Sequence, residues 1–151
     1  MAVQLVVGEG DEVVVPAPSW PNFAGAIIGR GGVPVFVPLS FGNDGWQLDL
    51  ERLFAAVTPR TRALFINTPA NPTGWTASEA ELRAILDFAR SRGLWIIADE
   101  IYGRFCYDGA LAPTFQTLRE PGDRILFVQT FSKTWAMTGW RMGWLQAPPE
   151  L

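Results

Sequence analysis

Short apolar runs alternate with stretches of helical character along the whole of this 151-residue sequence. The runs are rich in Val, Ile and Leu and are bounded by Gly and Pro, so each is interpreted as a buried strand. Strands are predicted at residues 12–16, 33–38, 62–68, 95–101, 125–130 and 141–146. This regular order leaves few folds open to the chain.

Helices are predicted between the strands, at residues 20–29, at residues 48–57 and behind Ser78. Ser78 and Glu81 have the spacing of a capping box. The apolar residues that follow have the i, i+3, i+4, i+7 spacing of one helical face: Leu82, Ile85, Leu86 and Ala89. Gly93 is expected to end this helix. Residues 41–45 are predicted to form a turn.

Strands and helices in this order predict an α/β fold with a mostly parallel sheet. In such sheets ligands bind beyond the carboxyl ends of the strands. The segments where a binding site is expected are therefore residues 16–20, 67–73, 99–102 and 130–133.

The composition excludes several classes of function. The net charge of −3 and the scattered basic residues argue against nucleic acid and anionic membranes as partners. No apolar run is long enough to span a membrane, and the sequence starts without a signal-peptide pattern, so a cytoplasmic location is expected. With Cys106 as the one cysteine and no histidine, we expect no metal site.

Polar groups stand at successive strand ends. Asp99 directly follows an apolar run, Asn71 begins an Asn-Pro-Thr-Gly turn, and Lys133 follows the next strand, with Arg141 two helical turns later. Each has an ordinary explanation as a capping residue, a turn or a surface cation. All four explanations holding together is improbable. Moreover, Lys133 is the only lysine among the 12 basic residues.

The sequence resembles the class I and II aminotransferases of fold type I, and the resemblance spans essentially the whole chain. Its lysine-to-arginine segment is highly specific, whereas the Asn-Pro-Thr-Gly segment alone is weak. The matching motifs are Ala17-Pro18-Ser19-Trp20, Asn71-Pro72-Thr73-Gly74, Ala98-Asp99-Glu100-Ile101-Tyr102 and Ser132-Lys133 through Thr138-Gly139-Trp140-Arg141-Met142-Gly143. The family implies a three-layer α/β/α domain whose last strand is antiparallel.

The resemblance implies pyridoxal 5'-phosphate as cofactor and three catalytic residues. Lys133 is expected to form a Schiff base with the cofactor and, once displaced, to move a proton from the substrate Cα, for which it must be neutral. Asp99 is expected to keep the pyridine nitrogen protonated, which makes the ring an electron sink. Tyr102 and Asn71 are expected to hydrogen-bond the ring oxygen.

The remaining cofactor ligands follow from the same resemblance. Arg141 is expected to clamp the phosphate, with hydroxyl donors from Thr130 and Ser132. Thr130 stands where serine is commoner in the family, a mild departure that keeps the hydroxyl. Trp20 is expected to stack on the ring, and the Asn71–Pro72 peptide bond is expected to be cis.

Three neighbours of these motifs are given no such role. Glu100 is expected to point to the face of the strand opposite Asp99. Trp75 and Trp140 lie beside site motifs, so lining of the pocket stays open for them, but packing in the core is favoured.

The length implies a partial protein if the resemblance holds. Residues 1–151 are expected to be one incomplete cofactor-binding large domain, without the family's preceding phosphate-binding segment and its following small domain. The fragment alone is then expected to have little or no activity, whereas the full-length parent is expected to be a homodimer.

The expected reaction is transamination between an amino acid and a 2-oxo acid. Two alternatives stay open: a lyase or decarboxylase with the same cofactor, and a non-catalytic sensor domain of a transcription regulator. A generic nucleotide-binding domain would need a phosphate loop that the sequence lacks.

Overall fold

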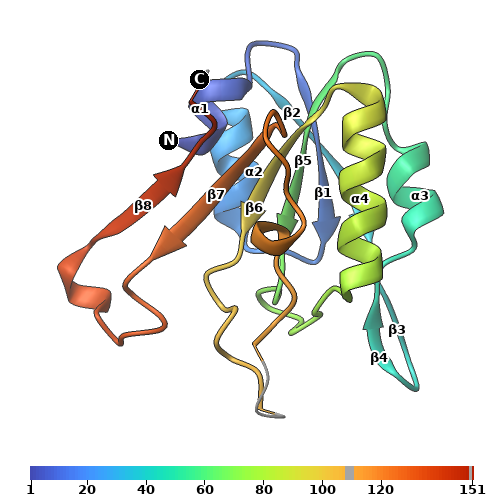
Figure 1. Cartoon of the computed structure of the whole chain (residues 1–151). Coiled ribbons are helices and arrows are strands. Elements are labelled where there is room, and N and C mark those ends of the chain that lie inside the picture. Colours follow the sequence, from blue (N-terminus) through green and yellow to red (C-terminus); the bar gives the residue numbers. More distant parts are fainter. Residues whose placement is uncertain (108–110, 150) are drawn as a thin grey trace.

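The chain folds around a six-stranded sheet, seen in a computed structural model that describes residues 1–107, 111–149 and 151. The strand order is β2-β1-β5-β6-β7-β8. All neighbouring strands are parallel except β8, which is antiparallel to β7 (Figure 1). The strand bounds are β1 Glu12–Ala17, β2 Val33–Pro38, β5 Thr61–Asn67, β6 Trp95–Asp99, β7 Ile125–Thr130 and β8 Gly143–Gln146.

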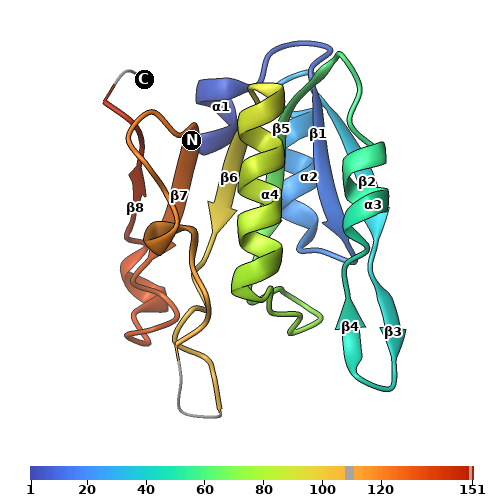
Figure 2. The same ribbon diagram turned by 45° about the vertical axis from the view of Figure 1, so that its right-hand side comes forward.

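Helices cover both faces of this sheet. Helices α1 (Ala2–Val6) and α2 (Pro21–Ile28) lie on one face, and α3 (Leu50–Ala55) and α4 (Glu79–Arg92) lie on the other (Figure 2). Adjacent strand residues therefore enter different cores, because successive side chains point to opposite faces.

The two cores can be followed along a single strand. Ile96 packs with the residues of α3 and α4, whereas the next residue, Ile97, packs with those of α1 and α2. Both isoleucines are at most 1% exposed. The three-layer α/β/α architecture with a mostly parallel sheet and an antiparallel last strand confirms the predicted fold class.

The predicted signals of α4 are all present. The Ser78 side chain accepts a hydrogen bond from the Glu81 amide, and the Glu81 carboxylate accepts one from the Ser78 amide. Gly93 ends the helix in the left-handed conformation at φ 64°. Leu82, Ile85, Leu86 and Ala89 are buried, as their spacing predicted.

The predicted turn at residues 41–45 was wrong in extent. It is the tip of a small antiparallel hairpin formed by β3 (Ser40–Gly42) and β4 (Gly45–Gln47). The Phe41 and Trp46 rings face each other across the two strands, with centroids 5.2 Å apart. This aromatic pair stabilises two strands that are too short to be recognised from periodicity.

Two strand predictions were too long. Strand β6 ends at Asp99 rather than at residue 101, because an Asp99 carboxylate oxygen accepts the amide of Ile101 and starts a turn. Strand β8 begins at Gly143 rather than at residue 141, because Arg141 has a φ of 52°, which no strand accommodates.

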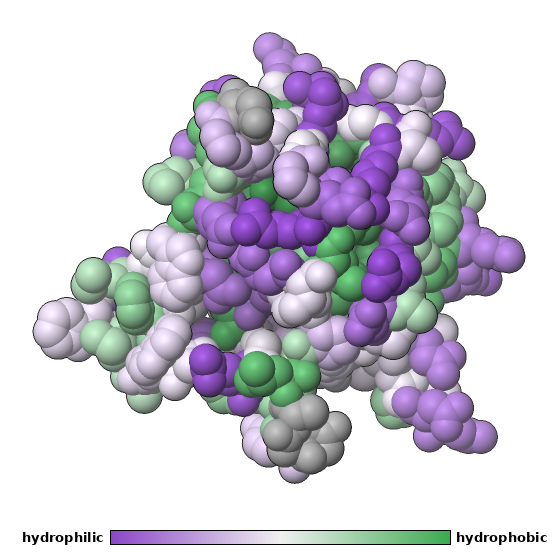
Figure 3. Space-filling view, in the orientation of Figure 1, coloured by the Kyte–Doolittle hydropathy of each residue, from purple (hydrophilic) through white to green (hydrophobic). Residues whose placement is uncertain are grey.

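The surface is uneven in character. Hydrophilic side chains cover most of the molecule around α4, whereas the protruding connection between β7 and β8 carries little strongly hydrophilic surface (Figure 3). Trp135, Trp140 and Met142 are exposed on this connection. Among the described residues, no helix has the length and apolar character needed to cross a membrane.

The β7–β8 pairing depends on a glycine. A Cβ at Gly143 would lie 2.6 Å from the Gln129 carbonyl oxygen, so Gly143→Ala must push β8 away from β7. We expect urea unfolding to show a loss of about 1–3 kcal/mol, as overpacked sites do. Gly139→Ala is the control, because a Cβ there meets nothing within 4 Å. Equal effects of both substitutions would contradict the prediction.

Candidate functional site

A cavity of about 200 Å³ lies at the carboxyl ends of the parallel strands. Its walls come from segments far apart in the sequence: the start of α2, the end of β5 and the loop behind it, the end of β6, and the turn after β7. The lining residues are Trp20, Phe23, Asn67, Asn71, Asp99, Ile101, Tyr102 and Lys133. Five of the eight predicted cofactor-binding residues are thus brought together: Trp20, Asn71, Asp99, Tyr102 and Lys133.

Asp99 is the buried anion of this cavity. It is the last residue of β6, a strand enclosed by β5 and β7, and it is only 4% exposed. Desolvation by burial raises the pKa of Asp99 to about 6, with a smaller contribution from the Glu100 carboxylate. No arginine or lysine among the described residues forms a salt bridge with it. The site therefore holds a carboxylate that lacks a cation.

Lys133 brings an amine to the same cavity. It follows β7 by three residues, so the parallel order of β6 and β7 places it near the end of β6. Its Nζ lies 5.9 Å from the centre of the Tyr102 ring. Tyr102 itself stands on the turn that Asp99 starts. An amine, a phenol and a buried carboxylate thus share one small space.

The loop that follows β5, residues 68–78, forms the wall of the cavity beside that strand, where Asn71 lines it. The Ala70 amide donates to the Trp75 carbonyl, and the Gly74 amide donates to the Ala70 carbonyl, at 2.8 Å each. The Asn71–Pro72 peptide bond is cis, as the family resemblance implied. Asn71 is held with its side chain at the cavity wall.

Two aromatic residues form the α2 side. Trp20 stands at the N-cap of α2, directly before Pro21 at the first helical position, and its ring is about half exposed. Phe23, one turn into the helix, packs on Phe65 of β5 with ring centroids 4.4 Å apart. Trp20 therefore offers an aromatic face that the apolar core does not occupy.

Thr130, Ser132 and Arg141 do not line the cavity. Thr130 and Ser132 have their hydroxyl oxygens 3.0 Å apart, and the Thr130 hydroxyl also lies 3.0 Å from the Met142 carbonyl oxygen. Arg141 precedes Met142, is exposed, and donates to the Thr138 carbonyl. Thr130 and Ser132 thus lie together at the end of β7, beside the turn that carries Lys133, whereas the Arg141 side chain bonds within the β7–β8 connection.

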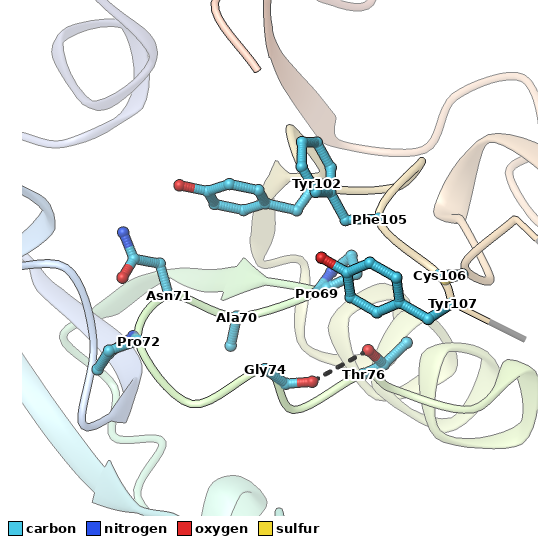
Figure 4. A pocket seen from close by; sticks show the side chains of 10 residues that line it. All are labelled: Pro69, Ala70, Asn71, Pro72, Gly74, Thr76, Tyr102, Phe105, Cys106 and Tyr107. Atoms are coloured by element: carbon cyan, nitrogen blue, oxygen red, sulfur yellow. Dashed lines mark hydrogen bonds between the residues drawn. The ribbon is translucent and has the colours of Figure 1, made fainter. Parts of the chain in front are cut away.

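A second, larger cavity of about 600 Å³ adjoins the first, and Asn71 and Tyr102 line both. Figure 4 shows the Tyr102 hydroxyl and the Asn71 amide projecting toward the same end of it. Its other walls are mainly prolines, Phe105, Cys106 and Tyr107. The two polar groups therefore stand where the small cavity opens.

Asn67 lies within a segment where a site was expected but was given no role, and the sequence did not indicate Phe23 as a site residue. Asn67 ends β5 in register with Asp99 and is 7% exposed. A polar residue that closes an apolar strand was the available signal, and Asp99 was found by that signal. Phe23 carried no signal, because an aromatic residue in an amphipathic helix is expected to pack in a core.

The three residues beside the site motifs that were given no cofactor role, Glu100, Trp75 and Trp140, differ in their surroundings. Glu100 is buried and accepts hydrogen bonds from the Thr114 hydroxyl and the Phe115 amide, so it anchors the segment before the short η1 helix (Phe115–Thr117). Trp75 is buried in the core, as predicted. The same prediction for Trp140 was wrong, since Trp140 is 68% exposed in the short η2 helix (Thr138–Trp140).

Comparison with known proteins gives a consistent result. The family described as "Aminotransferase class I and II" matches residues 1–151. Aromatic-amino-acid aminotransferase 2 of Thermococcus litoralis is 41% identical over 98% of this chain and 38% of its own length. The probable aspartate/prephenate aminotransferase of Aquifex aeolicus is 43% identical over 96% of this chain and 37% of its own.

Solved structures agree with this match. N-succinyldiaminopimelate aminotransferase from Mycobacterium tuberculosis superposes with a TM-score of 0.91 at 36% identity, over 99% of this chain and 39% of that one. The aromatic aminotransferase from Pyrococcus horikoshii gives 0.89 at 40% identity, over 97% and 39%. The chain spans somewhat more than a third of the length of these relatives.

Proposed function

The chain belongs to the family of class I and II aminotransferases, and we propose that it binds pyridoxal 5'-phosphate and carries the proton-transfer residues for transamination between an amino acid and a 2-oxo acid. The observation that carries this proposal is that the buried Asp99, which forms no salt bridge with any described residue, and the amine-bearing Lys133 line the same small cavity. The names of the relatives favour transamination over lyase or decarboxylase chemistry and over a sensor role.

The residues fit this cofactor chemically. A buried carboxylate is stable in its charged form only beside a cation or several donors. Among the described residues, the Asp99 carboxylate accepts one hydrogen bond, from the Ile101 amide, so a protonated ring nitrogen is the partner that its position calls for. Pyridoxal 5'-phosphate supplies an aldehyde that bonds an amine and a protonated pyridine ring that withdraws electrons.

Lys133 is the residue that would bond the cofactor and move the proton. Its Nζ is the single lysine amine of the chain and lies at the wall of the cavity. Freed by the incoming substrate amine, the uncharged Nζ would take the proton from the substrate Cα and deliver it to the former aldehyde carbon of the cofactor. In the second half of the reaction it would move a proton in the opposite direction. The Tyr102 ring faces this amine, with its centre 5.9 Å from Nζ.

The other residues bind and orient. Asn71 and Tyr102 would donate hydrogen bonds to the ring oxygen, and the exposed ring of Trp20 would cover one face of the cofactor. Thr130, Ser132 and Arg141 would hold the phosphate at the end of the β7–β8 pair. For this the Arg141 guanidinium must exchange its bond to the Thr138 carbonyl for a bidentate pair with phosphate oxygens.

We also infer that residues 1–151 are part of a large cofactor-binding domain within a longer protein. The support is that the chain covers only 38% and 37% of the two relatives' lengths. The exposed Trp135, Trp140 and Met142 supply an apolar surface of the kind that homodimers bury. The full-length parent is therefore proposed to be a homodimer, and little activity is expected from the chain alone.

Borohydride reduction of the chain mixed with pyridoxal phosphate tests the proposed function. Because the chain has one lysine, peptide mapping should find the reduced cofactor on Lys133, with the terminal amine as the main competitor. The same labelling with pyridoxal, which lacks the phosphate, should require a much higher concentration. No label on Lys133 in a folded chain, or equal labelling by both compounds, would contradict the proposal.

A further inference from the structure

Asn67 connects two parts of the site, at Asn71 and at Asp99, that lie 28 residues apart in the sequence. Its side-chain nitrogen donates to the Asp99 carbonyl at 3.0 Å. Its side-chain oxygen accepts the amide of Asn71 at 2.8 Å. One buried amide side chain thus contacts the backbones of both residues, and it lines the same cavity as they do.

These two bonds need an amide and not a generic polar group. A carboxylate has only acceptors, and a hydroxyl is too short to reach an acceptor and a donor on opposite sides. The Asp99 carbonyl also accepts the Thr68 amide at 3.1 Å, so the ladder between β5 and β6 already satisfies it. The bond from Asn67 is therefore additional to the sheet.

The loop behind β5 shows what this addition does. The Thr68 hydroxyl accepts the Ala77 amide at 2.8 Å, which fixes the far end of the loop to its base. Without Asn67, no hydrogen bond among the described residues would connect the near end of the loop, at Asn71, to β6. Asn67 is the contact that sets the distance from Asn71 to Asp99.

We propose that Asn67 is a positioning residue of the cofactor site, which fixes Asn71 and Asp99 relative to each other so that both can bind the same ring. This inference rests on the proposed function. Asn67 contacts the backbones of its two partners, so its effect on the cofactor passes through them.

Two substitutions separate the two bonds. Asn67→Ala removes both, whereas Asn67→Asp keeps the volume and the acceptor for the Asn71 amide and loses the donor to Asp99. Asn43→Ala, in the exposed turn between β3 and β4, is the control. Circular dichroism and urea unfolding establish whether each variant is folded. If Asn67→Ala does not fold, the proposal is tested with Asn67→Asp alone.

Amide hydrogen exchange of the ligand-free chain is the first readout, because it is independent of activity. In Asn67→Ala the Asn71 amide should exchange about tenfold faster, the factor expected for loss of one ordinary hydrogen bond. In Asn67→Asp and Asn43→Ala it should remain as protected as in the wild type. Unchanged Asn71 exchange in folded Asn67→Ala would overturn the proposal.

The second readout is the concentration of pyridoxal phosphate that half-saturates reductive labelling of Lys133. Both Asn67 variants should need at least about ten times more cofactor, since each loses a bond that orders the ring partners. Asn43→Ala should match the wild type. Wild-type half-saturation in a folded Asn67→Asp variant would overturn the proposal. Absence of labelling in the wild type itself would instead contradict the proposed function.

Discussion

Exchange of Lys133 for alanine is expected to abolish covalent capture of pyridoxal phosphate and to lower transamination by the full-length gene product at least about a thousandfold, as loss of a covalent catalytic residue does. The chain has no second lysine to replace it. The Lys133→Arg variant should lose as much labelling and transamination activity as Lys133→Ala. A guanidinium keeps the positive charge but does not give up its proton to become a base or nucleophile. The measurements are borohydride labelling and the initial rate of 2-oxo acid formation.

The control returns a lysine at another position. Arg83 lies on the exposed side of α4, away from the cavity, where it pairs with Glu79. A Lys133→Ala, Arg83→Lys double variant has the lysine content of the wild type but no amine near Asp99. It should remain unlabelled at cofactor concentrations that saturate the wild type. If the lysine introduced at position 83 of the double variant were labelled as fully as Lys133 is in the wild type, any exposed lysine would react with the cofactor in this way. The labelling would then give no evidence of a specific binding site.

The fold could be predicted because its buried parallel strands stand out in the sequence as short apolar runs. Strands β2 and β7 have the bounds that their apolar runs predicted. Strand ends that depend on a side-chain contact were misplaced. The turn that ends β6 is made by the Asp99 carboxylate, and Arg141, two residues before β8, adopts a positive φ without being glycine. Neither the turn nor the backbone conformation can be recognised from the spacing of apolar residues in the sequence.

The site was predictable to the extent that it follows from topology. Asp99 and Lys133 were found because parallel strands bring their carboxyl ends to one edge. Asn67 lies at the same edge, within a segment where the site was expected, but it was given no role, because its function is visible only in the two hydrogen bonds that reach Asp99 and Asn71. Trp140 was misjudged because aromatic residues usually pack in a core, and nothing local indicates that its surroundings are solvent.

Asp99→Asn is expected to have opposite effects on cofactor binding and on the stability of the ligand-free chain. An asparagine oxygen can still accept the Ile101 amide, but the anion that pairs with the ring nitrogen is gone. Labelling of Lys133 should therefore need much more cofactor. At pH 7 the ligand-free variant should be more stable by about 1–3 kcal/mol, because a pKa raised from 3.8 to about 6 means that ionised Asp99 destabilises the fold.

The pH dependence identifies the cause of that gain. A carboxyl whose pKa is raised in the folded state makes the wild type lose stability as pH rises from about 4 to about 6. The variant lacks this loss, so the two unfolding free energies should converge below pH 4, separate between pH 4 and pH 6, and differ by a nearly constant amount above pH 6. Glu100, whose pKa burial also raises, is present in both chains and largely cancels.

Asp123→Asn serves as the control, because it is expected to change the unfolding free energy at pH 7 in the opposite direction. Its hydrogen bonds from Arg90, at 2.7 and 2.8 Å, lower the pKa of Asp123, so its contribution to stability is present at neutral pH and is lost as pH falls. That variant should be less stable than the wild type at pH 7. If Asp99→Asn also destabilises the ligand-free chain at pH 7, then Asp99 is an ordinary structural carboxylate. A stabilised variant that no longer captures the cofactor would mean that the chain keeps an unfavourable buried charge at the position where the cofactor ring requires one.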